Sequence, residues 1–257
     1  MTSPTSPFDL TGRLAVVTGC RRGIGFAMAE ALARAGADII GVSASLEDGG
    51  SAIERRVRDL GCAFTAHRAD LSDRAAVAGL AARLADNHPP VDILINNAGG
   101  ISRAPAVAHG DKEWDDILAL NLSAPFRLAR ELGRRMVERR QGKIIFVASM
   151  LSFQGGVNVV SYASAKSGIA GLTRALANEW APHGVNVNAV APGYIATDNT
   201  KPLQDDPERS ASIIGRIPAG RWGRPDDLGG ATVFLASSAA DYVHGTILAV
   251  DGGWLGR

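Results

Sequence analysis

A tyrosine and a lysine four residues apart, Tyr162 and Lys166, are the residues of this chain best suited to chemistry. Their spacing places both side chains on one face of a helix, one turn apart. A phenol has a pKa of about 10, so a nearby positive charge is needed to favour the phenolate near neutral pH. Ser149, thirteen residues before Tyr162, adds a hydroxyl that can hold the oxygen of a reactant. The three residues together predict proton transfer between an alcohol and a carbonyl; the alternative is a buried tyrosine beside a surface lysine.

A glycine-rich turn precedes this group in the chain and has the sequence Gly19-Cys-Arg-Arg-Gly23-Ile-Gly25. It follows a predicted strand at residues 13–18 and opens a predicted helix at residues 23–34. Glycines let such a turn tighten and let phosphates approach the backbone, and the helix N-terminus offers free N–H groups and a partial positive charge. The turn therefore predicts a dinucleotide bound through its pyrophosphate at Gly19, Gly23, Ile24 and Gly25. The alternative is a tight turn that serves packing alone.

Residues after other predicted strands are further cofactor candidates, because ligands bind at the carboxyl ends of parallel strands. Five residues that follow the third and fourth predicted strands qualify: Asp70, Leu71, Asn97, Ala98 and Gly99. Asp70 is expected to meet an adenine edge, although an acid there can also cap a helix together with Ser72.

The choice between NADP and NAD depends on the end of the second predicted strand. An NAD site usually has an acid there to hold the ribose hydroxyls, but this chain has Ser43, and Asp38 stands at the other end of the strand. Arg21 and Arg22 lie in the glycine turn, where a guanidinium can hold a 2′-phosphate. The sequence therefore favours NADP over NAD, unless both arginines are simply solvated.

Composition excludes several other classes of protein. The chain has 257 residues, 46% of them hydrophobic and 21% charged, with a net charge of +1. Such a balance gives no electrostatic footprint for nucleic acid or an anionic membrane. The two cysteines and five scattered histidines indicate neither a disulfide framework nor a metal site. No apolar run reaches the roughly 18 residues of a membrane span, and the polar N-terminus lacks the core of a signal peptide. We expect a cytoplasmic protein with a flexible tail at residues 1–7.

The pattern of apolar runs predicts an α/β fold in a single domain over residues 1–257. Strands are expected at residues 13–18, 38–43, 63–68, 91–95, 143–148, 185–191 and 247–250. Helices are expected at residues 23–34, 50–60, 74–86, 112–140 with an interruption near Pro125, 161–181 and 226–236. Strands that are apolar on both faces and alternate with helices predict a parallel sheet covered on both sides. The irregular, proline-rich stretch 194–224, with a short helix at 207–214, is expected to be a substrate lid.

These motifs together resemble the short-chain dehydrogenase/reductase family over nearly the whole chain. The marks of the resemblance are the glycine turn, Asn96-Asn-Ala-Gly99, Asn121, Ser149, Tyr162-x-x-x-Lys166 and Pro192-Gly193. The resemblance implies a doubly wound Rossmann fold with a seven-stranded parallel sheet, commonly assembled as a homotetramer. It implies that Tyr162 is the general acid and base, that Lys166 holds the nicotinamide ribose, that Ser149 orients the substrate oxygen and that Asn121 anchors a water. It also adds four residues to the cofactor site: Pro192, Gly193, Ile195 and Thr197.

A closer likeness, to the 2-deoxy-D-gluconate 3-dehydrogenase group and its gluconate 5-dehydrogenase relatives, implies a sugar-acid substrate. It rests on residues 148–156, 178–181, 191–200, 216–223 and 251–255, whereas residues 100–110 match poorly. That group usually employs NAD, in contrast to the arginine pair of this chain. The residues expected to hold substrate are Arg103, Gln154, Asn199 and Arg221, with Lys201 as a further cation. Two alternatives stay open: a 3-oxoacyl thioester reductase, and a nucleotide-sensing protein without catalysis.

Overall fold

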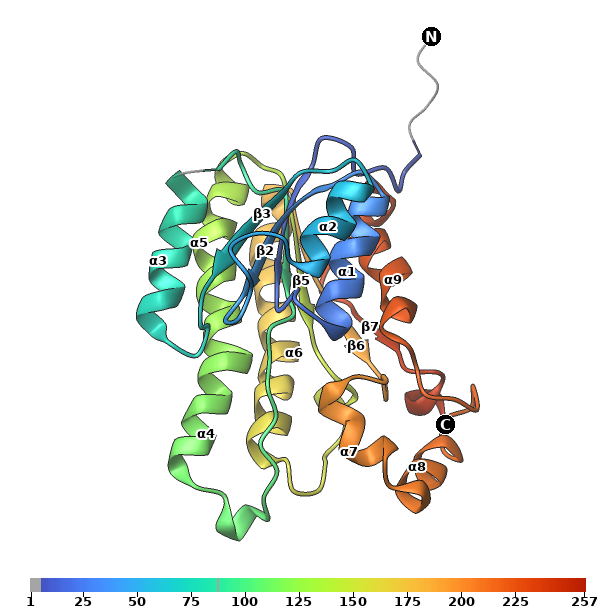
Figure 1. The fold of residues 1–257 in the computed structure, drawn as a ribbon. Helices are drawn as coiled ribbons and strands as arrows, with labels where there is room; N and C mark the ends of the chain where they lie inside the picture. The colour runs from blue at the N-terminus through green and yellow to red at the C-terminus, as the bar shows by residue number, and fades with distance from the viewer. Residues whose placement is uncertain (1–5, 87) are drawn as a thin grey trace.

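The computed structural model describes residues 6–86 and 88–257, and the strands of this part of the chain form one parallel sheet. Their order in space is β3-β2-β1-β4-β5-β6-β7 (Figure 1). The strands are β1 Leu14–Thr18, β2 Asp38–Ser43, β3 Phe64–Arg68, β4 Ile93–Asn96, β5 Gly142–Val147, β6 Val185–Pro192 and β7 Ile247–Val250. The order reverses at β1, which β2 and β4 flank, and open α/β sheets bind ligands beside such a switch point. The predicted seven-stranded Rossmann sheet is confirmed.

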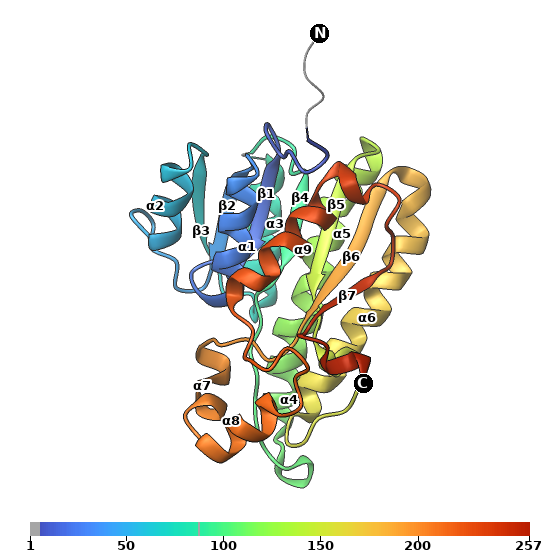
Figure 2. The ribbon, with the colours of Figure 1, turned by 90° about the vertical axis from the view of Figure 1, so that its right-hand side faces the viewer.

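Helices cover both faces of the sheet, as the alternating pattern predicts (Figure 1, Figure 2). The helices are α1 Gly23–Arg34, α2 Ala52–Asp59, α3 Arg74–Asp86, α4 Asp111–Leu118, α5 Ala124–Glu138, α6 Val160–Trp180, α7 Lys201–Gln204, α8 Pro207–Ile214 and α9 Gly229–Ala236. The side chains of α1, α2 and α9 pack on one face, and those of α3, α5 and α6 pack on the other.

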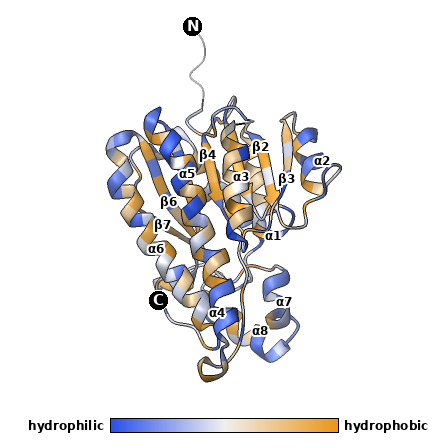
Figure 3. Cartoon of the chain, turned by 90° about the vertical axis from the view of Figure 1, so that its left-hand side faces the viewer, coloured by the Kyte–Doolittle hydropathy of each residue, from blue (hydrophilic) through white to orange (hydrophobic). Residues whose placement is uncertain are grey.

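Successive strand residues enter these two cores in turn, because side chains alternate across a strand. In β1, Val16 belongs to one core and Ala15 and Val17 to the other, and all three are fully buried. Figure 3 shows the strands coloured largely as hydrophobic, whereas the helices carry both hydrophobic and hydrophilic residues. Burying one such valine contributes about 1.5–3 kcal/mol, so the sheet gives the site a rigid base.

The helix predicted over residues 112–140 is divided, but not at the predicted place. A wide, π-type turn over Ala119–Ser123 separates α4 from α5. Pro125 lies in the first turn of α5, where a helix has no use for the missing N–H, so the proline starts the second helix. Such wide turns are frequent at functional sites, and this one carries Asn121.

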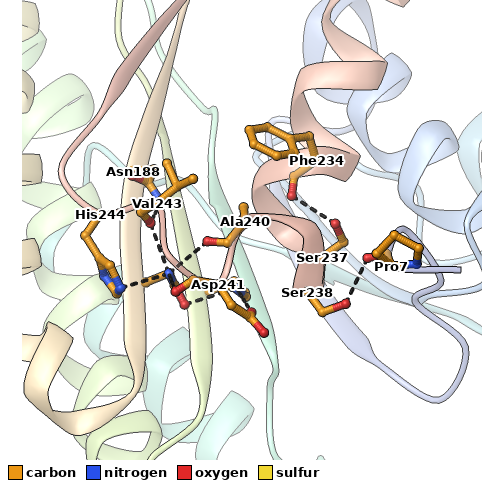
Figure 4. A network of polar contacts seen from close by, with 11 residues as sticks. Pro7, Asn188, Phe234, Ser237, Ser238, Ala240, Asp241, Val243 and His244 are labelled. Atoms are coloured by element: carbon orange, nitrogen blue, oxygen red, sulfur yellow. Dashed lines mark hydrogen bonds and ion pairs between the residues drawn. The ribbon is translucent and has the colours of Figure 1, made fainter. Parts of the chain in front are cut away.

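Two asparagines of β6 hold the loop that leads into the edge strand β7, at the end of the sheet where β6 begins (Figure 4). Asn186 Nδ2 lies 3.1, 3.1 and 3.0 Å from the carbonyl oxygens of Ala240, Asp241 and Val243. Asn188 Nδ2 donates to the Val243 carbonyl at 2.8 Å. Polar loop groups are thereby satisfied against the sheet, which fixes β7 in register.

The N-terminal segment is attached at Pro7, inside the tail that the sequence predicts to be flexible. The Pro7 carbonyl accepts hydrogen bonds from the Ala239 N–H at 3.1 Å and the Ser238 hydroxyl at 3.0 Å (Figure 4). The last residue of the predicted tail therefore contacts the body of the protein, the flexibility of the tail stays a prediction, and residues 1–5 lie outside the described part of the chain.

The segment 194–224 lies beyond the carboxyl ends of the strands, at the opposite end of the molecule from the N-terminal segment (Figure 1, Figure 2). It carries α7 and α8, the latter over the predicted residues. Ile195 pairs with Gly223 in an isolated parallel bridge that closes the base of the segment. An apolar cluster packs it against the C-terminus and comprises Met150, Tyr194, Leu203, Ile213, Ile217, Trp222, Trp254 and Leu255. Its position suits a lid, and its movement stays a prediction.

Candidate active site

A cavity of about 590 Å³ opens at the carboxyl ends of the strands, between the glycine turn, the helix α6 and the segment 194–224. Most of the residues that the sequence assigns to a site line this one cavity. They are Gly19, Arg21, Arg22, Gly23, Ile24, Gly25, Ser43, Asp70, Leu71, Asn97, Ala98, Gly99, Asn121, Tyr162, Lys166, Thr197 and Asn199. The fold therefore brings the predicted phosphate turn and the predicted catalytic pair to the same place.

The glycine turn is shaped to receive phosphate groups. Gly19 has φ of +68°, a conformation that other L-residues rarely adopt. A Cβ at Gly25 would lie 2.3 Å from the Gly19 carbonyl oxygen, so only glycine fits there. The residue before α1, Arg22, makes no side-chain hydrogen bond to the first turn of the helix. The first-turn N–H groups thus face the cavity with the positive end of the helix dipole, as a pyrophosphate requires.

Thr18 and Asn97 join the glycine turn to the end of β4. The Thr18 hydroxyl accepts hydrogen bonds from the N–H groups of Asn97 and Ala98 at 2.9 and 3.0 Å. Asn97 Nδ2 donates back to the carbonyls of Thr18 and Gly19 at 2.9 and 3.3 Å. All of these contacts join a side chain to the main chain at the switch point of the sheet. The side chain of Asn97 therefore fixes the shape of the cavity floor.

Asn121 has a buried polar atom that the described protein groups leave unpaired. Its side chain is 1% exposed, and its Nδ2 donates to the carbonyls of Gly100 and Ile117 at 3.0 Å each. Its Oδ1 has no hydrogen-bond partner among the described residues, although a buried acceptor normally has one. An unpaired acceptor at the cavity wall fits a site completed by a nucleotide or by water.

Tyr162 and Lys166 project from the first two turns of α6, and Ser149 follows β5. The Lys166 ammonium lies 5.5 Å from the centre of the Tyr162 ring and donates to the Val147 carbonyl at 2.7 Å. The Ser149 hydroxyl is a hydrogen-bond partner of Tyr162. Tyr162 is half-buried, and Ser149 and Lys166 are only 9% and 5% exposed. The three predicted groups therefore meet at one end of the cavity.

The expected effect of Lys166 on the phenol is not what the protein groups produce. Burial raises the pKa of Tyr162 above its ordinary value of 10.0, and the hydrogen bond from Ser149 and the charge of Arg103 only partly oppose this. Burial also lowers the pKa of Lys166 from 10.5 to about 8. For the protein groups alone, desolvation therefore dominates over charge, and the prediction that Lys166 favours the phenolate together with the cationic nicotinamide ring stays a prediction.

Arg103 brings a second positive charge to the catalytic group, from the segment that the resemblance matches poorly. Its charge acts on the Tyr162 hydroxyl, and its Nη2 donates to the carbonyl of Asn199 at 3.1 Å. Asn199 lines the cavity from the lid side. Arg103 is thus joined to the lid side of the cavity through Asn199, although it is exposed and not itself a lining residue.

Both arginines of the glycine turn have carboxylate partners, which the sequence does not predict. Arg21 Nη2 lies 2.9 Å from Glu47 Oε1, and Arg22 Nη1 lies 2.9 Å from Asp198 Oδ2. Neither group is therefore without a counter-ion, and both remain in contact with solvent, since the Arg21 side chain is 42% exposed and the Arg22 side chain 72% exposed. Asp70, in turn, accepts hydrogen bonds from the N–H and hydroxyl of Ser72 at 2.9 and 2.7 Å while lining the cavity. It does not cap α3 as its alternative role required, because that helix begins at Arg74 and its first turn donates to Asp73, from the Ala75 N–H at 2.8 Å.

Several predicted site residues lie outside the cavity lining. Gln154 Oε1 accepts from the Trp254 indole at 3.4 Å, and Lys201 pairs with Asp205 at 2.9 Å. Three predicted cofactor residues at the end of β6 and in the bridge also lie behind the wall: Pro192, Gly193 and Ile195. The sequence could not exclude them, because they border residues that do line it.

Arg221 is occupied by a structural ion pair and not directed at a substrate. Its Nη1 and Nη2 lie 2.7 and 3.2 Å from the two carboxylate oxygens of Asp227. This fork holds the pKa of Asp227 at about 2, below its ordinary 3.8. The pair therefore fastens the base of the lid segment, and the predicted substrate role of Arg221, which would require this pair to open, stays a prediction.

We expect Asp227→Asn to lower the free energy of unfolding by about 1–2 kcal/mol at pH 7, since a partly buried, bidentate ion pair is lost. The depressed pKa means that the carboxylate stabilises the fold above about pH 4, and that this stabilisation is lost as the pH falls toward 2. Urea unfolding of both proteins from pH 7 to about pH 2 checks the size, and the difference should be constant above about pH 4 and shrink below it. Asp226→Asn, the neighbouring acid, is the control; an equal loss in that variant would contradict the assignment.

The described residues include no group of three side chains able to hold a metal ion, and none of their helices is long and apolar enough to cross a membrane.

Sequence reasoning missed Val147, whose carbonyl holds Lys166, and Glu47, whose carboxylate holds Arg21. No local pattern marks either of them, because each contact joins residues far apart in the chain.

Comparison with known proteins identifies the family of the chain. A family model described as enoyl-(acyl carrier protein) reductase matches residues 19–255, so the chain belongs to this branch of the short-chain dehydrogenase/reductase family of enzymes. The chain is also similar to the 2-dehydro-3-deoxy-D-gluconate 5-dehydrogenase of Pseudoalteromonas atlantica. The two are 58% identical over 250 residues, which cover 97% of this chain and 98% of that protein.

Solved structures give the same result for the fold. A proposed NAD(P)-dependent gluconate 5-dehydrogenase of Beutenbergia cavernae, crystallised with bound NADP, is 50% identical with a TM-score of 0.94, covering 98% of this chain and 100% of that one. A gluconate 5-dehydrogenase of Burkholderia cenocepacia in complex with NADP and tartrate is 38% identical, with a TM-score of 0.92 and 98% of each chain covered. The predicted family and fold are therefore confirmed.

Proposed function

We propose that this protein is an NADP-dependent dehydrogenase of a sugar acid, which interconverts a secondary alcohol and a ketone on a substrate of the 2-dehydro-3-deoxy-D-gluconate class. The observation that carries the proposal is that one cavity brings together the glycine turn and the pair Tyr162 and Lys166, while Arg103 donates to the carbonyl of Asn199 in the cavity lining at 3.1 Å. A proton-transfer site beside a cation suits a hydroxylated substrate that also bears a carboxylate. Relatives of this chain are named as dehydrogenases of such acids, and two solved relatives contain NADP, which supports the same function and cofactor.

The residues of the glycine turn, of α6 and of the lid side of the cavity are suited to bind the nucleotide. The N-terminus of α1 with Gly19, Gly23 and Gly25 would hold the pyrophosphate, Lys166 the nicotinamide ribose, and Arg21 the adenosine 2′-phosphate. When bound, the nicotinamide supplies the hydride chemistry. Thr197, which the resemblance also implies, belongs to the nucleotide site as well, because it lines the lid side of the cavity.

Proton transfer falls to the groups at the end of the cavity. In oxidation the Tyr162 phenolate takes the proton of the substrate alcohol and becomes the phenol, and in reduction the phenol gives this proton to the ketone oxygen. The Ser149 hydroxyl donates a hydrogen bond to the same substrate oxygen and so orients it toward Tyr162. By family likeness, Asn121 holds a water that relays the proton from Lys166 toward solvent, and its unpaired Oδ1 is the acceptor that such a water would fill.

Absorbance of the reduced cofactor over a panel of sugar acids, polyols and a short acetoacetyl thioester tests the proposal. We expect turnover of a deoxyketogluconate or gluconate and little turnover of polyols that lack a carboxylate. Preferential turnover of the thioester would instead favour a 3-oxoacyl reductase, the alternative that the sequence leaves open and the activity named for a solved structure with 32% identity to this chain. Nucleotide binding without turnover of any member would favour the non-catalytic alternative.

Arg103→Gln should raise KM for the sugar acid by about 10- to 100-fold, because hydrogen bonds to charged groups contribute about 1.5–3 kcal/mol. The effect on a neutral polyol of the same length should be less than about threefold, because that substrate has no carboxylate to hold. Steady-state kinetics with both substrates measure the contrast, and Arg103→Lys should restore part of the loss. Arg209→Gln, on the exposed surface of α8, is the control. An equal loss for acid and polyol would place Arg103 outside substrate recognition.

We also propose a cytoplasmic homotetramer, as the sequence predicts. The edge strand β7 and the ring of Tyr242, which is 99% exposed, support an interface at this end of the sheet. Light scattering after size exclusion checks the assembly, and a monomer at micromolar concentration would contradict it.

A further inference from the structure

We infer that Glu47 weakens the hold of this site on a ribose 2′-phosphate by occupying the guanidinium of Arg21, and that Glu47 thereby sets the discrimination between NADP and NAD. The inference rests on the proposed function in one respect, since it requires that the cavity binds an adenine dinucleotide. It goes further by making an acid outside the cavity lining a determinant of cofactor choice.

The geometry places Arg21 where the adenosine ribose is expected. Arg21 lines the cavity, and its backbone N–H donates to the hydroxyl of Ser43 at 3.4 Å, at the end of β2. In doubly wound folds the ribose 2′ position is read at the end of this strand. Arg21 is therefore one of the two glycine-turn cations available to a 2′-phosphate, and it is the one whose backbone contacts the end of β2.

That guanidinium is already engaged. Its Nε and Nη2 donate to a single oxygen, Oε1 of Glu47, at 3.2 and 2.9 Å. The contact lowers the pKa of Glu47 and raises the pKa of Arg21, so both groups are ionised at the pH at which an enzyme works. Both side chains are nearly half exposed, at 46% and 42%, so the pair is in contact with solvent and can exchange partners.

The balance of charges at the glycine turn explains why the contact between Arg21 and Glu47 affects the binding of a phosphate. The glycine turn supplies two positive charges, from Arg21 and Arg22, and Glu47 and Asp198 neutralise one each. A phosphate monoester brings nearly two negative charges at neutral pH. It must therefore draw Arg21 away from Glu47 or bind beside a like charge. The charge of Arg55 in α2 also lowers the pKa of Glu47. A second cation is therefore close to this carboxylate when Arg21 binds a phosphate instead.

Glu47→Gln should tighten the binding of adenosine 2′,5′-diphosphate about fivefold, because an exposed charge pair contributes up to about 1 kcal/mol. Binding of 5′-AMP, which lacks the 2′-phosphate, should change less than about twofold, because no charge then faces position 47. Titration calorimetry with these two nucleotides measures the effect without any turnover. The ratio of kcat/KM for NADP over NAD should rise by the same factor.

Three controls give the experiment its resolution. Asp48→Asn removes the same charge from the next residue, which is also exposed, and should change neither nucleotide's affinity more than about twofold. In an Arg21→Ala background the gain from Glu47→Gln should fall below about twofold, because the two residues act as a pair. The gain should also shrink near 1 M salt, where exposed charges are screened.

The outcomes separate this inference from the proposed function. If the wild type binds both nucleotides and Glu47→Gln leaves the affinity for the 2′,5′-diphosphate unchanged, the inference is overturned and the NADP site stands. A gain that Asp48→Asn reproduces, or that persists in the Arg21→Ala background, also overturns it. If the folded wild type binds neither nucleotide, the proposed nucleotide site fails and the role of Glu47 fails with it.

Discussion

Tyr162→Phe should lose at least about 100-fold in kcat while NADP still binds within about threefold of the wild-type affinity, because general acid–base groups contribute roughly 10² to 10⁴-fold. The substitution removes only the hydroxyl that Ser149 contacts and leaves the ring beside Lys166 in place. The loss is therefore chemical in origin and not a consequence of an emptied core position. Steady-state turnover together with calorimetric titration of NADP separates these two effects.

Tyr242→Phe is the matched control for this prediction. It removes the same atom from a ring that is 99% exposed and remote from the cavity lining. We expect that variant to retain full turnover. A Tyr162→Phe enzyme that keeps more than about a tenth of kcat would reject the acid–base role, since that loss is below the range for such groups.

The parts of this fold that the sequence predicts are those with local rules. The strand residues Ala15, Val16 and Val17 are all apolar, which signals a strand buried on both faces, and the structure places them in two cores. The spacing of Tyr162 and Lys166 is likewise a property of a single helix. Because these rules operate within a few residues, the elements and the catalytic pair follow directly from the printed sequence.

The contacts that the sequence does not predict are long-range or depend on desolvation. Glu47 meets Arg21 across 26 positions of the chain, and nothing in either local pattern indicates the pairing. No spacing rule predicts the wide turn at Asn121, so the sequence predicts the interruption of the helix near the proline that follows it. The pKa of Tyr162 depends on how much protein surrounds it, which no motif records.

The lid shows the same division between local and long-range information. The helix α8 is predicted at its observed bounds, because Asp206 caps it and Pro207 starts it. Arg221 is then a plausible substrate cation by sequence and an engaged one by structure, because its partner Asp227 lies beyond the predicted segment. Cations near a site are therefore informative only once their counter-ions are known, and the counter-ions distinguish Arg103 from Arg221.

Lys166→Met should lose at least about 100-fold in kcat/KM and yet increase the free energy of unfolding at pH 7 by about 1–2 kcal/mol. The gain is expected because burial lowers the pKa of Lys166 from 10.5 to about 8, so the charged form is disfavoured in the folded chain. Between about pH 8 and 10.5 the unfolded chain binds the additional proton, so wild-type stability rises with pH across this window. The advantage of the variant should therefore be largest below pH 8 and should disappear toward pH 10.5.

Urea unfolding at pH 7, 8.5 and 10 measures this trend, and Lys112→Met, at a position where the side chain is 81% exposed, is the control that should show neither change. The lost hydrogen bond to the Val147 carbonyl limits the gain, because a buried acceptor then stays unpaired. Stability that falls in Lys166→Met at every pH would show that this bond outweighs the burial of the charge. The combination of lost activity and increased stability would instead show that the fold holds a buried cation at this position for its chemistry, at the expense of its own stability.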